Sequence, residues 1–483
     1  MPPVRYLQLD SKLDLSLYFE DSTREHFLLK MISKVVAVCV ALISLTAKVQ
    51  AETWTEIPCN TTSQCPEDNP CCSQYGMCGT GWYCLGGCDP RSSYNLTACM
   101  PQPRMSSFTD PLSDASKILN VEQYLGNASE ANWVYTGHVD SKDEATLLQM
   151  PKDSTGSVIS STKYLWYGRV GASLKSSRDK GVITAFIMFS DVQDEIDLEF
   201  TGSDLSFPQT NFYSKGALNY TNTGRFEVTN TFENWHYYEM DWQEDQIRWF
   251  VDGKIVRTLE RASTWSDKSK KFEFPSTPSR IQFSIWPAQA ALGGLTDWAG
   301  GSIDWESDDI KNVGYYYAYV KNVSVQAYDL PSLIDQRMTN ISGDHAFLYE
   351  SADGNEDNVY LTKEKTWLGS SDASGLNPDN EDKKPSASVV LPKSSNFTSI
   401  STPEKTKAPK AQSTSTDSVS VAPSSTLEVY SGGFVQNLNS SSPPSTSSSM
   451  PPASGARSQN QDVLWSVSIA VCAIVGGLFY TIY

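Results

Sequence analysis

Basic residues are scarce in this sequence of 483 residues: 38 Lys and Arg stand against 56 Asp and Glu, which gives a net charge of −18. Without a basic stripe the chain cannot displace counterions from a phosphate backbone, so nucleic acid is excluded as a partner. Histidine is scarce too, with four scattered residues, and no Cys/His pair has the spacing of metal ligands. We therefore expect no metal site and no cofactor.

Cysteine is almost absent outside one short stretch. Eight of the ten cysteines lie between Cys59 and Cys99, and the other two, Cys39 and Cys472, lie in apolar segments near the ends. A region this short cannot bury a core of its own, so we predict a small module over residues 52–104 that is held together by disulfides. The spacing alone leaves 105 possible connectivities.

An apolar run follows Met31 and ends near a small-residue site at Ala51. These features are typical of a secretory signal peptide, which we place at residues 31–51 with Glu52 as the mature N-terminus. Residues 1–30 carry charges that do not suit a signal, so we interpret them as an upstream extension and Met31 as the true start. The alternative is an uncleaved anchor with a cytosolic tail.

A second apolar run, residues 463–483, carries no charge, and small residues and a polar spacer precede it. This order is typical of a signal for attachment of a glycosylphosphatidylinositol (GPI) anchor, with Ser454 as the attachment site. The alternative is a plain transmembrane helix. With the signal peptide, the pattern predicts a secreted protein held at the outer face of the plasma membrane.

No repeated helical pattern interrupts the middle of the chain. Short runs rich in Val, Ile, Tyr, Phe and Trp alternate with turn residues, which predicts an all-β fold and a β-sandwich. The clearest hairpin joins residues 246–251 to 254–258 through Asp252-Gly253, a favoured tight-turn pair. We place a stalk at residues 346–462; most of it is rich in Ser, Thr and Pro, which predicts disorder and O-glycosylation.

The segment DEIDLEF, residues 194–200, places Glu195, Asp197 and Glu199 at alternate positions. On a β-strand all three side chains point to one face, where like charges repel. Retaining glycosidases need one carboxylate as nucleophile and another as acid/base, about 5 Å apart. Glu195 and Glu199 could lean together over Asp197, and the crowding would separate their pKa values.

The segment resembles the catalytic strand of glycoside hydrolase family 16, and its flanks resemble the fungal Crh branch. The flanking matches are residues 211–213, 216–220, 231–236, 285–287 and 298–301. The resemblance implies a concanavalin-like β-jelly-roll over residues 105–345, with Glu195 as nucleophile, Asp197 as its helper and Glu199 as acid/base. It further implies that the sugar-binding cleft is lined by Trp286, Thr296, Trp298, Tyr213 and, as a weaker candidate, Lys271.

The cysteine cluster resembles chitin-binding modules of the hevein type, through residues 70–79 and Tyr83-Cys84. The resemblance implies sugar contacts at Ser73, Tyr75 and Tyr83. Met77 replaces the usual aromatic residue, so binding is expected to be weak, and Trp82 could substitute. The alternative is a disulfide knot that no longer binds chitin. The implied disulfides are Cys59–Cys72, Cys65–Cys78, Cys71–Cys84 and Cys88–Cys99.

Together these resemblances imply a monomeric enzyme of the fungal cell wall that cleaves chitin and transfers the chain to β-glucan. Two other functions use the same residues. A pure hydrolase would need the same acids and would differ only in how it binds the acceptor. A wall lectin without activity would be expected to have lost one of the two glutamates, and neither is lost.

Overall fold

The computed structural model describes residues 56–217, 219–288, 294–331, 334 and 345–380, which all belong to one compact unit. The upstream extension, the signal peptide, residues 381–462 of the stalk and the C-terminal apolar tail with Ser454 lie outside these residues. What we predicted for them stays a prediction. No helix in the described ranges has the length and apolar character needed to cross a membrane.

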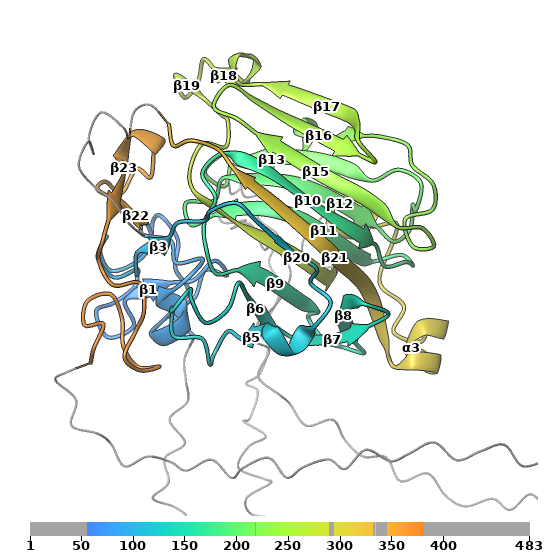
Figure 1. The fold of residues 1–483 in the computed structure, drawn as a ribbon, viewed down its shortest axis with the longest axis horizontal. Helices are drawn as coiled ribbons and strands as arrows, with labels where there is room; N and C mark the ends of the chain where they lie inside the picture. Colours follow the sequence, from blue (N-terminus) through green and yellow to red (C-terminus); the bar gives the residue numbers. More distant parts are fainter. Residues whose placement is uncertain (1–55, 218, 289–293, 332–333, 335–344, 381–483) are drawn as a thin grey trace, which may run out of the picture. The chain divides into compact units, whose positions relative to one another are not determined.

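Two β-sheets pack face to face in the described part of the chain (Figure 1). The β10 sheet has the order β17 (Lys254–Glu260), β16 (Gln246–Val251), β15 (His236–Trp242), β10 (Gly168–Lys175), β21 (Tyr315–Ala327), β8 (Ala145–Pro151) and β7 (His138–Lys142), with β4 (Phe108–Asp110) against β21. The β12 sheet has the order β14 (Gly224–Arg225), β13 (Gln209–Tyr213), β12 (Glu195–Thr201), β11 (Val182–Ser190), β20 (Ser279–Pro287), β9 (Ser157–Ser161), β6 (Trp133–Thr136) and β5 (Leu119–Asn120). The predicted all-β sandwich is confirmed.

Several short elements lie outside these two sheets, besides the strands of the cysteine-rich module and of the C-terminal segment described below. They are η1 (Gly81–Cys84), η2 (Ala115–Lys117), η3 (Tyr220–Asn222), η4 (Arg261–Thr264), β18 (Trp265–Ser266), β19 (Lys271–Phe272), α2 (Leu295–Trp298), α3 (Asp308–Val313) and η5 (Glu356–Asn358). The predicted hairpin is formed by β16 and β17. Its turn residues Asp252 and Gly253 have φ angles of 49° and 76°, the left-handed conformation that a two-residue turn of this type requires.

Alternation along the strands builds the core between the sheets. Phe186 of β11 and Phe283 of β20 stack there with ring centroids 4.6 Å apart, and Trp242 and Trp249 come from the β10 sheet. All nine residues of β11 and all nine of β20 are buried. Side chains that alternate with the core residues point to the opposite face of the β12 sheet, which we call its outer face. Because every residue of β11 and β20 is buried, this outer face is also covered over these two strands.

The cysteine-rich module contains the short strands β1 (Cys71–Cys72) and β2 (Cys78–Gly79). Its disulfides are Cys59–Cys72, Cys65–Cys78, Cys71–Cys84 and Cys88–Cys99, the same four pairs that the hevein resemblance implies. The module does not stand apart. Its buried Leu85 and Cys88 share an apolar cluster with Tyr124 and Val134 of the sandwich.

The structure corrects the start of the stalk, which we placed at residue 346. Strands β22 (Ala346–Tyr349) and β23 (Val359–Thr362) form a three-stranded sheet with β3 (Gln102–Pro103). Phe347 is fully buried in the main core, and Leu368 packs into the cluster under the module. Because polar residues stand between these apolar positions, the sequence pattern did not indicate the two short strands. Residues 346–380 belong to the folded unit.

Candidate active site

Strand β12 carries the three predicted acids on the outer face of its sheet. Glu195 and Asp197 are buried, and Glu199 is partly exposed. The residues that alternate with these acids pack into the core between the sheets: Ile196, Leu198 and Phe200. The alternation seen in the sequence therefore places all three carboxyl groups on one face.

A buried ion pair fixes the start of β12. Asp194, directly before Glu195, accepts hydrogen bonds from Nζ of Lys215 at 2.7 Å, from Oγ1 of Thr277 at 2.6 Å and from the backbone N–H of Ser276 at 3.0 Å. Burial alone would raise the pKa of Asp194, but the charge of Lys215 and these hydrogen bonds lower it below its ordinary value. Asp194 is thus a charged anchor at the start of β12.

Strand β13 lies beside β12 and presents Tyr213, Asn211 and Gln209 opposite the three acids, in that order. Nδ2 of Asn211 donates a hydrogen bond to the hydroxyl of Tyr213 at 2.7 Å. Tyr213 was predicted as a cleft residue, whereas Asn211 and Gln209 were missed. Gln209 and Asn211 alternate with Thr210 and Phe212 on a buried strand, but their place opposite the acids depends on the pairing of β13 with β12, for which the sequence holds no local signal.

An aromatic pair stands beside Glu199. The indoles of Trp286 on β20 and Trp298 on α2 stack with centroids 6.3 Å apart. Nε1 of Trp298 also donates to Oε1 of Gln209 at 2.9 Å, and Gln209 is opposite Glu199. Thr296 lies on the same short helix. The structure thus brings Trp286 and Trp298 to the Glu199 end of the acid row, and Thr296 with them.

The environment raises the pKa values of two of the three acids, Asp197 and Glu199. Burial, and then the negative charge of Glu195, raise the pKa of Glu199 to about 8. Burial, the charges of Glu195 and Glu199, and a hydrogen bond with Glu195 raise the pKa of Asp197 well above its ordinary range. At neutral pH, Glu199 therefore favours its protonated form, the form that a general acid needs.

Strand β12 is also supported from the core side. Nε1 of Trp249, on β16, donates to the backbone carbonyl of Asp197 at 3.0 Å. The guanidinium of Arg257 lies 4.9 Å from the centroid of the Trp249 ring and donates to the backbone carbonyl of Thr210 at 3.0 Å. Arg257 also lowers the pKa of Asp197, against the larger effect of burial.

Lys271 is placed differently from the other predicted cleft residues. It is exposed on the small hairpin of β18 and β19, and its Nζ donates to Oδ1 of Asn355 at 3.3 Å. Its contact is with the C-terminal segment, and the structure does not group it with the three acids.

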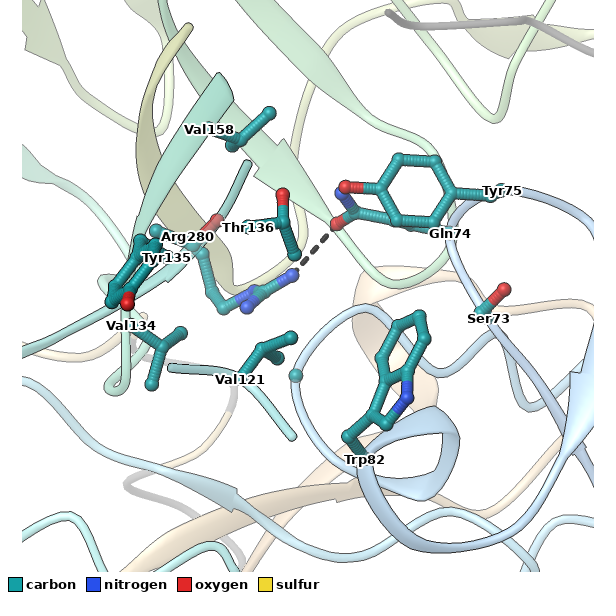
Figure 2. Close-up of a pocket in the computed structure, with 12 residues that line it drawn as sticks. Ser73, Gln74, Tyr75, Trp82, Val121, Val134, Tyr135, Thr136, Val158 and Arg280 are labelled. Atoms are coloured by element: carbon teal, nitrogen blue, oxygen red, sulfur yellow. Dashed lines mark hydrogen bonds between the residues drawn. The ribbon is translucent and has the colours of Figure 1, made fainter. Parts of the chain in front are cut away.

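The predicted chitin contacts of the module face the β12 sheet. Ser73, Tyr75 and Trp82 line a small cavity together with side chains of β6, β9 and β20 (Figure 2). Tyr83, the third predicted contact, lies beside Trp82, with ring centroids 4.1 Å apart, and is not among the lining residues. The face that the resemblance assigns to sugar is therefore next to the surface that carries the acids.

Within the described ranges, the one group of side chains with the geometry to hold a metal ion consists of Cys59, Cys65 and Cys72. All three sulfurs are in disulfides, so they offer no thiolate ligands.

Comparison with known proteins agrees with this geometry. Residues 127–307 match the family described as Glycosyl hydrolases family 16. The chain is 50% identical over 436 residues to the Crh-like protein UTR2 of Candida albicans, which covers 86% of this chain and 92% of that relative. The chain belongs to the Crh-like proteins of glycosyl hydrolases family 16.

Other relatives of this Crh-like protein are similar over much of their length. It is 47% identical to Crh-like protein 2 of Aspergillus fumigatus, over 66% of this chain and 72% of the relative. It is 45% identical to Congo red hypersensitive protein 2 of Saccharomyces cerevisiae, over 70% and 72%. The solved structure of apo Crh5 transglycosylase matches 55% of this chain and 98% of its own, with a TM-score of 0.45 and 24% identity. Family membership confirms the prediction of a cell-wall enzyme of the glycosidase and transglycosylase class.

Proposed function

We propose that this Crh-like protein cleaves chitin with retention and transfers the released chain to β-glucan, which cross-links the two polymers of the fungal wall. The observation that carries the proposal is the state of the two glutamates on β12. Glu195 and Glu199 share one face of the strand, and the pKa of Glu199 is raised to about 8 while the charge of Glu195 contributes to that rise.

The two glutamates act in two steps. Glu195 attacks the anomeric carbon of a chitin unit, while Glu199 gives its proton to the departing oxygen. A covalent glycosyl-enzyme results, and Glu199 is now ionised. It then takes the proton of a glucan hydroxyl, which attacks the same carbon and releases Glu195. Asp197 lies between the two glutamates on the same face, and we assign it the role of helper that limits the repulsion in the row.

Transfer has to compete with water, which is far more concentrated than any polymer hydroxyl. A hydroxyl held in attack geometry can reach effective molarities of about 10⁵ M and above. We assign this holding role to Trp286 and Trp298, because the stacked pair lies at the Glu199 end of the acid row. Flat rings of this kind stack on sugar faces and exclude water.

The remaining parts of the proposal concern location. The chain is secreted after cleavage at Ala51, glycosylated on its stalk, attached through Ser454 to a GPI anchor, and works as a monomer at the outer face of the plasma membrane. Terminal sequencing of the mature protein tests the first step, with Glu52 expected as the first residue. Release by a phospholipase that cleaves GPI anchors tests the attachment.

The catalytic assignment is tested with Glu195→Gln and Glu199→Gln, assayed for transfer of a labelled chitin oligosaccharide to a β-glucan oligosaccharide. Each variant removes a carboxyl group that has no substitute, so transfer should fall by several orders of magnitude. Glu260→Gln, at an exposed position on β17, is the matched control and should keep full activity. Near-normal transfer in Glu195→Gln would refute the assignment of the nucleophile.

A further inference from the structure

Three tyrosines follow one another along the outer face of the β10 sheet, the face turned away from the core. Strand β21 buries alternate side chains of residues 316–320 in the core, so Tyr315, Tyr317 and Tyr319 lie on the outer face, where all three are partly exposed. Neighbouring rings are in contact, with centroids 6.2 Å apart for the first pair and 5.6 Å for the second. The acids of β12 are on the other sheet, so these rings are not part of the active site.

Two rings from the segment before β15 lie beside the tyrosines. Phe232 contacts Tyr317 with centroids 5.7 Å apart, and Trp235, which is 37% exposed, contacts Tyr319 at 6.2 Å. We call these two rings and the three tyrosines of β21 the aromatic row. A contiguous exposed aromatic surface indicates a binding partner. Rings that carry a hydroxyl or an N–H group at one edge suit a partner with both apolar and polar surface.

Cationic side chains border the aromatic row. Nζ of Lys321 lies 4.4 Å from the centroid of Trp235, and the guanidinium of Arg178 lies 4.4 Å from the centroid of Phe232. Both groups offer N–H donors, and neither offers an acceptor. A ligand on the row therefore meets flat apolar faces with donors for hydroxyl groups at their border, which is the surface that a sugar ring needs.

An N-glycosylation sequon stands at one end of the row. Asn322, the residue after Lys321 on β21, begins the sequence Asn-Val-Ser. It is exposed, and its φ of 53° places it at an irregularity in the ladder with β10. Its backbone N–H donates to the carbonyl of Pro111 at 2.8 Å, whereas its side-chain amide makes no hydrogen bond with any residue that the structure describes. Nδ2 of Asn322 is therefore available for attachment of a glycan.

The other sequons within the described ranges are in turns. In each of them the asparagine Oδ1 accepts hydrogen bonds from the backbone N–H and the hydroxyl of the residue two positions later. They begin at Asn60, Asn95, Asn127 and Asn219. Asn322 differs because it stands on a strand, so that a glycan attached there begins at the face of a sheet.

The position of Asn322 suits a glycan that lies on the row. Strand residues are about 3.3 Å apart, so Tyr319 is about 10 Å and Tyr315 about 23 Å from Asn322 along β21. The first two sugars of an N-linked glycan span the shorter distance, and its branches reach the rings beyond. Because the glycan is tethered, its local concentration at the row is far above that of any free ligand.

We propose that Asn322 carries an N-linked glycan whose first sugars lie on the aromatic row, with Trp235 and Tyr319 as the rings on which they stack. The glycan then stabilises the fold and covers the outer face of the β10 sheet, which keeps this surface from binding other proteins in the wall. The inference goes beyond the proposed reaction. It requires only that the chain is secreted, which is the part of the proposed function that concerns location.

The test compares the full chain, secreted from a fungal host, with its Asn322→Gln variant. Mass spectrometry of peptides should find a glycan on Asn322 of the wild type. Hydroxyl-radical footprinting then measures the rate at which each tryptophan is oxidised. Trp235 should be oxidised severalfold faster in Asn322→Gln, whereas Trp265, which is 48% exposed, should react equally in both. Asn127→Gln, which removes a sequon in a turn, is the matched control and should leave the rate at Trp235 unchanged.

Loss of the stacked glycan should also lower the melting temperature, by about 2–4 °C for a loss of 1 kcal/mol in a domain of this size. In a Trp235→Ala background, Asn322→Gln should change the melting temperature much less, because the ring and the sugar are coupled. Trp235→Phe keeps a ring and should retain most of the difference, which guards against a general effect of the substitution.

An unmodified Asn322, or a rate of oxidation at Trp235 that is the same with and without the glycan, would overturn the inference. If Trp235 is oxidised as slowly in Asn322→Gln as a buried residue, something else covers the row, such as a wall polysaccharide or a second copy of the chain, and the inference is equally wrong. None of these measurements involves turnover, whereas the transfer assay judges the proposed reaction and terminal sequencing judges secretion, so each can fail separately.

Discussion

The indole N–H of Trp298 donates to Oε1 of Gln209 at 2.9 Å, and Gln209 is the ladder partner of the acid Glu199. This bond ties a ring from the short helix after β20 to strand β13, on the far side of the catalytic strand. The ring is thereby fixed at the Glu199 end of the acid row, next to the group that we propose as the acid/base.

Trp298→Ala should shift the products from transfer toward hydrolysis, because the acceptor sugar loses its stacking surface while water keeps its access. Mass analysis of the products at fixed acceptor concentration gives the ratio, which we expect to fall about tenfold. Trp298→Phe should lie between the variant and the wild type. Trp367→Ala, at a position 46% exposed, is the control. An unchanged ratio in Trp298→Ala would remove the acceptor role from this residue.

The rate of cleavage should fall as the pH rises through about 8. The pKa of Glu199 is raised to about 8, and cleavage needs its protonated form, so the active fraction declines about tenfold per pH unit above this value. The pH profile should be measured with circular dichroism at each pH to verify folding. A constant rate up to pH 10 would show that Glu199 does not supply the proton.

Asp197→Asn should impair activity less than Asp197→Ala. Burial and the charges of the two glutamates raise the pKa of Asp197 well above its ordinary value, and an amide of the same shape can donate a hydrogen bond to Glu195. Alanine removes the donor and leaves a space between the glutamates. Transfer rates of the two variants, measured in parallel, provide the comparison; equal losses would mean that the charge of Asp197, and not its hydrogen bond, is what matters.

The junction between module and sandwich should be more stable in mild acid. There Oδ1 of Asp191 accepts a hydrogen bond from the backbone N–H of Gly87, in the module, at 3.0 Å. Burial raises the pKa of Asp191 to about 6, although the charge of Arg280 and hydrogen bonds from Tyr164 and Gln102 oppose the rise. Because the folded state binds the proton more tightly than the unfolded state, this stability is present below about pH 4 and is lost as the pH rises through about 6.

Between these two pH values the contribution of Asp191 to the free energy of unfolding falls by roughly 3 kcal/mol at most. Unfolding by denaturant between pH 4 and pH 7 measures it. In Asp191→Asn this part of the pH dependence should be absent. Other acids, such as Asp194, are present in both proteins, so their contributions cancel when the two are compared. Parallel pH dependences in the two proteins would contradict the assignment.

Phe347→Ala should lower the free energy of unfolding by about 3–5 kcal/mol, as for other large core residues. Phe347 is fully buried on β22, in a segment whose sequence suggested a stalk. Leu376→Ala, 36% exposed in the same segment, should cost far less. A small effect of Phe347→Ala would mean that the C-terminal strands contribute little to the fold.

Local patterns in the sequence were enough to predict the parts of the site that depend on local structure. Alternation placed Glu195 and Glu199 on one face of a strand, and Asp252-Gly253 marked the hairpin. The missed residues Asn211 and Gln209 follow the same rule of alternation, but their role depends on pairing with β12, which the sequence does not display.

The docking of the module could not be predicted in the same way. Oε1 of Gln74, in the module, accepts a hydrogen bond from Nη2 of Arg280 on β20 at 2.7 Å. The two residues are 206 positions apart, and neither has a local pattern that indicates a partner. The boundary at residue 346 was wrong for a related reason: β22 and β23 are short strands among polar residues, and they gain their stability from β3, far away in the chain.

The most direct test of the proposed transglycosylase activity is the product mixture formed from a chitin oligosaccharide donor and a fluorescent β-glucan acceptor. After incubation with the full chain, the products are separated and identified by mass. Hybrid chains that carry chitin units on the labelled glucan, in amounts that rise with acceptor concentration, are the predicted result. Shortened chitin alone at every acceptor concentration would contradict the account and leave a hydrolase in its place.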